Sequence, residues 1–202
     1  MITATRLSCC LRRAFSSKAF VLPHSAPAVE DINPSELWTT ATDPNATKPP
    51  TTGTTRIFYN TPKGNITVIS ALDSPSKGTE QAKRESVRKC IGSAVKAVTG
   101  LGINSLKQVV VDGREDPHAA AVAAHLAAYK FTLKTSPPSP FNPNGAEGAP
   151  EPIKITSLEK NEDWERGVLY AECQNFARTL TALPANMITP TVRMFRSRSA
   201  GY

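Results

Sequence analysis

The apolar positions in the middle of the chain follow a strand pattern first and a helical pattern afterwards. Residues 56–59 and 66–71 are β-prone runs on either side of a segment with a proline and a glycine, which predicts two paired strands joined by a turn. Over residues 80–98 the apolar side chains recur every three or four positions, which predicts an amphipathic helix. Gly100 and Gly102 are expected to end it.

A buried strand and a second helix are predicted next. Residues 108–111 form a nearly continuous apolar run, as expected for a central strand of a parallel sheet. Asp116 and Pro117 suit the N-cap and the first turn of a helix. Residues 119–129 are alanine-rich and apolar on nearly every side, so neighbouring elements should cover this helix.

The remaining regular segments lie toward the end of the chain. Residues 129–133 and 153–156 are candidates for two more strands. Residues 161–183 are predicted to form a helix that Pro184 ends and that docks on the core through an apolar stripe. This stripe comprises Leu169, Cys173, Phe176, Leu180 and Leu183. Strands that alternate with helices predict a layered α/β domain over residues 54–160.

Four segments have compositions that do not suit a packed core. Residues 1–29 are rich in Arg, Ser and Ala and contain no acid, which is typical of a mitochondrial transit peptide; a disordered basic terminus on a cytoplasmic protein is the alternative. Residues 30–53, dominated by Thr, Pro, Asn and Ala, are interpreted as a disordered linker. Residues 136–152 are proline-rich and are interpreted as a surface loop, and residues 192–202 form a divergent basic tail.

The net charge of +7 comes from the two ends of the chain. Residues 1–29 hold four basic side chains and the last ten residues hold three, both without an acid, whereas residues 30–192 hold 17 basic and 17 acidic side chains. A nucleic-acid-binding domain needs a basic face on its folded part, so nucleic acid is an unfavoured partner. No apolar run reaches the roughly 18 residues of a membrane span, so no membrane partner is expected.

Three groups of polar residues are candidates for a site, and each has a structural explanation. His118 and His125 are two helical turns apart, about 10 Å, which is too far for one metal ion. The acids of residues 112–116 lack the alternating spacing of a calcium loop, and Asp116 is expected to cap a helix. Acids at the start of the last helix suit the helix dipole. These are Glu159, Glu162, Asp163 and Glu165.

The cysteines add no site either. The four of them form no C-x-x-C pair, which argues against a disulfide framework and a zinc site and favours a reduced, intracellular protein. From its own residues, the chain is therefore predicted to contain no catalytic, cofactor-binding or metal-binding residue.

A long segment with mixed residue types resembles a known family. It contains Gln174-Asn175, Ala177-Arg178 and Leu180, and it continues through Pro184-Ala185-Asn186 to Thr189-Pro190-Thr191. This spacing resembles the helix and turn that link the two domains of leucyl aminopeptidases, also called cytosol aminopeptidases. The helix is expected to dock on the core and to leave its arginine available for pairs across domains. Upstream segments extend the resemblance to residues 54–191.

The resemblance implies a three-layer α/β/α N-terminal domain, similar in topology to macro domains, over residues 54–160. Residues 161–191 would be the interdomain helix and the start of a catalytic domain. The family's enzymes remove N-terminal residues with two divalent ions, usually zinc, manganese or magnesium, and they assemble into hexamers. Their metal ligands come from the C-terminal domain, whereas this chain departs from the family after Val192. No catalytic or metal-binding residue can therefore be carried over.

Three hypotheses follow from the resemblance. The first is a truncated family member, inactive alone, which would act on peptides only if completed by a catalytic domain. The second is that this chain is a partial gene model of a longer enzyme. The third is a binding or oligomerisation module, which would hold a nucleotide-like ligand or pair with itself or with full-length aminopeptidase subunits. No glycine-rich phosphate loop supports the nucleotide version.

Overall fold

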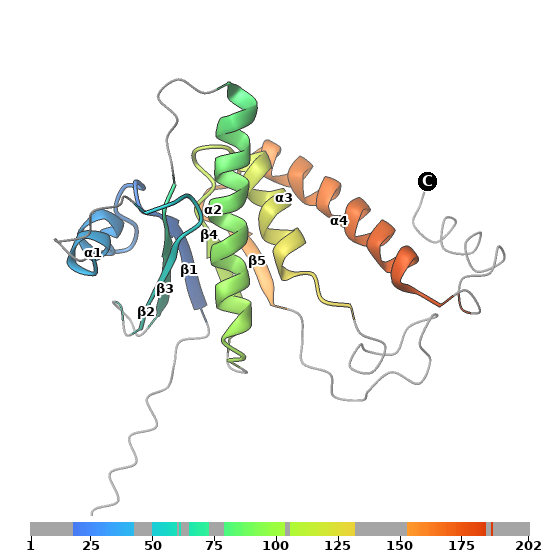
Figure 1. Ribbon diagram of the computed structural model, residues 1–202, viewed down its shortest axis with the longest axis horizontal. Coiled ribbons are helices and arrows are strands. Elements are labelled where there is room, and N and C mark those ends of the chain that lie inside the picture. Colours follow the sequence, from blue (N-terminus) through green and yellow to red (C-terminus); the bar gives the residue numbers. More distant parts are fainter. Residues whose placement is uncertain are drawn as a thin grey trace, which may run out of the picture.

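The computed structural model describes residues 18–42, 50–59, 61, 65–72, 79–103, 106–131, 153–184 and 187. A five-stranded sheet with the order β2-β3-β1-β4-β5 forms its centre (Figure 1). The strands are β1 (Lys18–Pro23), β2 (Thr55–Phe58), β3 (Ile66–Ser70), β4 (Gln108–Val111) and β5 (Lys154–Ser157). Only β2 runs antiparallel to its neighbour; β1 is paired in parallel with both β3 and β4.

Helices cover both faces of this sheet, which makes a three-layer α/β/α domain. The helices are α1 (Pro34–Thr40), α2 (Glu80–Gly100), α3 (Pro117–Ala128) and α4 (Glu162–Ala182). On one face α2 and α3 pack on the strands, and α4 lies against α3 on the side away from α2 (Figure 1). On the other face α1 and the turn before it cover Phe20, Leu22 and Ile69.

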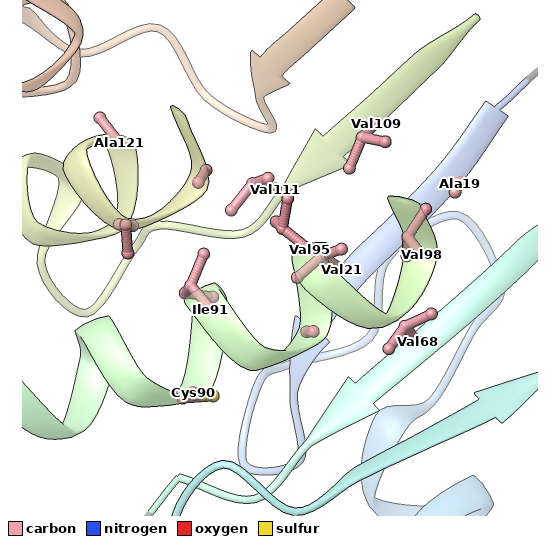
Figure 2. Packing of buried hydrophobic residues seen from close by; sticks show 14 of the residues in the cluster. Ala19, Val21, Val68, Cys90, Ile91, Val95, Val98, Val109, Val111 and Ala121 are labelled. Atoms are coloured by element: carbon pink, nitrogen blue, oxygen red, sulfur yellow. The ribbon is translucent and has the colours of Figure 1, made fainter. Parts of the chain in front are cut away.

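The main core lies between α2 and the three parallel strands at the centre of the sheet. Figure 2 shows valines of β1, β3 and β4 on the same side as the apolar residues of α2. Successive strand residues point to opposite faces. Val21 therefore faces α2, whereas its neighbours Phe20 and Leu22 face α1. Burial on both faces explains why β1, β3 and β4 are nearly continuous apolar runs.

The fold begins much earlier than the sequence predicted. Strand β1 falls within the predicted transit peptide, and α1 falls within the predicted linker. The physical signals were present but short: an apolar run at residues 19–22, and Pro34 directly after Asn33, which suits the start of a helix. Composition averaged over residues 1–29 and 30–53 concealed both. Residues 1–17 lie outside the described part, so a shorter transit peptide stays a prediction.

The elements predicted from residue 54 onward are confirmed with small shifts, except for the strand predicted at residues 129–133. Strands β2 and β3 pair antiparallel with Thr55 opposite Ser70. Helix α2 continues to Gly100, and Gly102 after it adopts a φ of 63°, which favours glycine. Residues 129–131 form no strand, while residues 132–133, the predicted loop 136–152 and the tail 192–202 lie outside the described residues. None of the described helices is both long and apolar enough to cross a bilayer.

The position of β1 predicts where the chain can be shortened. Removal of residues 1–29 deletes the strand between β3 and β4, including Phe20, Val21 and Leu22, which are at most 1% exposed. Each such side chain contributes roughly 1.5–3 kcal/mol, against a total stability of about 5–15 kcal/mol for a domain. Thermal unfolding followed by circular dichroism should therefore lose its cooperative transition in this variant.

Removal of residues 1–17 is the matched control, because every described strand stays in place. It should retain the cooperative transition of the 202-residue chain. A variant lacking residues 1–29 that unfolds at the same temperature as the whole chain would contradict a central β1.

Candidate functional site

Helix α4 docks on α3 through Gly167 and Ala171, and Trp164 near its start is also buried. It starts after Asn161, whose Oδ1 accepts a hydrogen bond from the backbone N–H of Asp163 at 2.8 Å. Its buried residues are Trp164, Gly167 and Ala171. A Cβ at Gly167 would lie 2.7 Å from both the Cβ of Ala121 and the backbone oxygen of His118. The two helix backbones thus approach so closely that only glycine fits at this position.

Polar side chains of α4 cap the end of α3. The last carbonyls of a helix have no partner within the helix. Asn175 Nδ2 donates to the His125 oxygen at 3.2 Å, and Arg178 Nη1 donates to the Leu126 oxygen at 3.3 Å. One residue past the end of α3, the hydroxyl of Tyr129 is 2.7 Å from that of Thr179.

These contacts give the family-like segment a structural role. Asn175 and Arg178 belong to the residues that carry the resemblance, and both bind the backbone of α3. Arg178 was expected to be available for pairs across domains. Its Nη1 instead caps α3 within this domain, and its guanidinium lies 6.0 Å from the centre of the Tyr129 ring.

Several large apolar residues of α4 are exposed, although Trp164 is buried. Leu169 is 57% exposed, Tyr170 68% and Phe176 42%, and Cys173 is also exposed. We call these four residues the outer face of α4. The prediction that a stripe of large residues docks on the core is therefore wrong at Leu169, Cys173 and Phe176, whereas Leu180 is half-buried and Leu183 is buried. The close backbone approach at Gly167 selects the opposite, small-residue face.

The two histidines of α3 both contact aromatic rings of α4. The centre of the His118 ring lies 5.2 Å from that of Tyr170, and the His125 ring lies 6.4 Å from that of Trp164. Burial lowers the pKa of His125, which the carboxylate of Glu172 partly opposes. The Nε2 atom of His125 is buried and has no hydrogen-bond partner among the described residues.

The acids before α3 are already engaged in internal contacts. Asp112 is 3% exposed, and its two carboxylate oxygens accept hydrogen bonds from the Arg114 guanidinium at 2.9 and 2.6 Å. This hydrogen bond raises the pKa of Arg114. Asp116 Oδ1 accepts from the Ala119 N–H at 2.9 Å, which confirms the predicted cap, and Oδ2 lies 3.2 Å from Nε of Arg84.

These acids do not fit the metal pair that the family resemblance implies. A two-metal site needs several carboxylates that converge on the ions. Asp112 and Asp116 are turned toward arginines, and Asp163 at the start of α4 lies 3.5 Å from Arg166 on the surface. Within the described ranges, no three His, Cys, Asp or Glu side chains are grouped closely enough to hold a metal ion.

A second histidine cluster was not anticipated from the sequence, because it involves the segment interpreted as linker. His24, at the end of β1, accepts a hydrogen bond from the Leu72 N–H at Nδ1, 3.1 Å away, and its ring lies 5.6 Å from that of Trp38 on α1. The Arg56 guanidinium stacks 4.3 Å from the Trp38 ring centre and donates to the Trp38 oxygen at 2.9 Å. Burial lowers the pKa of His24. The cluster fixes α1 to the edge of the sheet.

Two further features lie outside the α3–α4 contact: the thiol of Cys90 and a groove beside α1. Burial raises the pKa of the Cys90 thiol to about 11, so this cysteine is not a nucleophile at neutral pH. A groove lies between α1 and the end of β2, and no motif in the sequence pointed to it. Its lining includes Asp31, Glu36, Leu37, Phe58 and Tyr59.

The close approach of α4 to α3 predicts the effect of a single methyl group. Gly167→Ala should destabilise the domain by about 1–3 kcal/mol, because the new Cβ meets the backbone of α3. Gly100→Ala is the matched control, since a Cβ there meets nothing within 4 Å. It should be neutral or stabilise by up to about 1 kcal/mol. Urea unfolding of both variants measures the difference, and equal stabilities would contradict this packing.

The sequence of this chain is similar to those of several cytosol aminopeptidases. No protein-family model matches the chain. It is 32% identical over 145 residues to the cytosol aminopeptidase of Dictyostelium discoideum, a match that covers 69% of this chain and 27% of that protein. It is 30% identical over 146 residues to the cytosol aminopeptidase of Bos taurus and 28% identical to that of Homo sapiens, each covering 69% of this chain and 26% of the relative.

The matched region is thus a large part of this chain and a small part of its relatives. The chain spans about a quarter of the length of the curated relatives that it matches. Over the matched residues, the chain belongs to the cytosol aminopeptidase (leucyl aminopeptidase) family.

Proposed function

We propose that this chain supplies the non-catalytic α/β domain of a cytosol-type aminopeptidase. Such an enzyme is a hydrolase that removes N-terminal residues from peptides with two divalent metal ions, zinc, manganese or magnesium. The family match supports the assignment to this class of enzyme. In this proposal the metal ligands come from a separate catalytic domain, and the present domain contributes no catalytic residue.

The observation that carries this proposal is the outer face of α4. Leu169, Tyr170 and Phe176 are each more than 40% exposed, and they lie on one side of a single helix. Covering apolar surface is favourable by roughly 25 cal/mol per Å², so a row of large apolar side chains is a natural contact surface. We propose that the rest of a longer aminopeptidase chain covers this face.

The residues of α4 that contact α3 hold the helix in a defined position on the domain. Gly167 sets the backbone of α4 directly on α3, while Asn175 and Arg178 bind the end of α3. A domain docked on the outer face would therefore be positioned relative to the sheet by α3. The acids of this domain support a non-catalytic role, because Asp112 and Asp116 are engaged by Arg114 and Arg84.

The same face favours a second candidate function. It could pair this domain with a second copy of itself or with full-length aminopeptidase subunits, which would make the chain a binding or oligomerisation module. The two candidates use the same residues and differ in whether the partner is part of the same polypeptide.

A location in the cell is a further part of the proposal. We propose that residues before β1 direct the protein to mitochondria, on the strength of their basic, acid-free composition, with a cytoplasmic protein as the alternative. Processing at residue 29 would remove β1, so any cleaved segment must end before Lys18.

The proposal predicts the outcome of an activity assay. The purified 202-residue chain, shown by circular dichroism to be folded, should not hydrolyse leucine amide faster than the uncatalysed reaction with manganese, zinc or magnesium present. A full-length cytosol aminopeptidase run in parallel is the positive control, and a chelator-treated sample corrects for contaminating enzyme. Metal-dependent turnover that follows the chain through purification would contradict a non-catalytic domain.

A further inference from the structure

We propose that the contact between α3 and α4 depends on pH, because protonation of His125 weakens the packing of α4 on α3. This inference goes beyond the proposed function, because it concerns a contact within the domain and holds whichever partner covers the outer face of α4. It rests on two buried polar atoms at the contact that have no partner among the described residues.

His125 lies near the end of α3, under α4. Its ring meets the ring of Trp164 edge to face at 6.4 Å, and its backbone oxygen accepts the hydrogen bond from Asn175 Nδ2. His125 Nε2 and Asn175 Oδ1 are both buried without a hydrogen-bond partner. Buried polar atoms in native proteins are nearly always paired, so two unpaired atoms at one contact need an explanation.

Protonation of His125 raises the free energy of the closed α3–α4 contact. Neutral imidazole carries one proton, which can sit on Nδ1 and leave Nε2 as a bare acceptor. Imidazolium carries a proton on both nitrogens, so the buried Nε2 becomes a charged donor, and the closed contact holds no hydrogen bond at this atom. Opening of α4 would let this N–H reach water. The closed contact therefore favours neutral His125.

The direction of the pH effect follows from proton linkage. Burial lowers the pKa of His125 below its ordinary value of 6.5 in the closed state, whereas an opened α3–α4 contact restores that ordinary value. The open state then binds more protons than the closed state at a pH between the two pKa values. The stability of the closed contact is fully present above about pH 6.5 and declines as the pH falls from there toward the lowered pKa.

Few charged groups can offset this effect. Glu172 on α4 raises the pKa of His125, but less than burial lowers it. Arg178 on α4 is bound to the Leu126 oxygen, and Lys130 after α3 is bound to the Thr99 oxygen. The other two elements packed against α3 are α2 and β5, which carry Lys96 and Lys154 among their charged residues.

Hydrogen exchange of α4 between pH 5.5 and 7.5 tests whether the α3–α4 contact depends on pH. After correction for the intrinsic pH dependence of exchange, amides of α4 should exchange faster at pH 5.5, by up to about tenfold if opening restores a pKa of 6.5. His125→Gln keeps a neutral polar side chain and should abolish this dependence. His118→Gln is the matched control on the same helix and should retain it.

The location of His24 and a direct titration of His125 separate this effect from other causes of pH dependence. His24 also has a lowered pKa, but it lies against α1 and the end of β3, so its effect would appear in the peptides of those elements and not in α4. An NMR titration of the His125 ring in the unmodified chain needs no variant. A His125 pKa at or above 6.5, α4 exchange that is independent of pH, or a dependence that persists in His125→Gln would each overturn the proposal.

Discussion

The backbone of α4 lies directly against α3 at Gly167, and this contact sets which side of α4 faces the domain. A Cβ at this position would come within 2.7 Å of two atoms of α3. Once the helices are this close, Trp164 and Ala171 are buried and the larger residues on the opposite side of the helix are left exposed. The same closeness brings Asn175 and Arg178 within hydrogen-bonding distance of the end of α3. One steric constraint thus accounts for the face of α4 that packs on α3 and for the opposite face that is exposed.

The sheet provides the platform for this contact. Strand β4 leads through Asp112, whose backbone N–H donates to Val21 of β1, into the loop that ends at the cap of α3. Arg114 binds the Asp112 carboxylate, and Asp116 caps the helix and pairs with Arg84 of α2. The charges of this loop therefore fix the start of α3, while α4 fixes its end. In a family whose chemistry depends on metals, this domain uses its acids for structure.

How much the sequence could predict depended on whether the information was local. The apolar run of β4 and the Asp116-Pro117 cap are local signals, and both were read correctly. Strand β1 has a four-residue apolar run beside basic residues, and too short a run has no clear period. The buried face of α4 was missed for a different reason. Periodicity identifies the apolar stripe of a single helix. The close contact between Gly167 of α4 and Ala121 of α3 depends on both helices, so neither helix's own sequence pattern reveals it.

The most direct test of this account uses the two described cysteines, because one lies on the outer face of α4 and the other in the core. Cys173 is exposed, whereas Cys90 lies on the buried face of α2. Alkylation of the monomeric native chain with iodoacetamide, resolved by peptide mass spectrometry, should modify Cys173 about as fast as a thiol in the unfolded chain. Cys90 should react only after unfolding. A native Cys173 as protected as Cys90 would show that the outer face is packed against the domain, and it would contradict the arrangement described for α4.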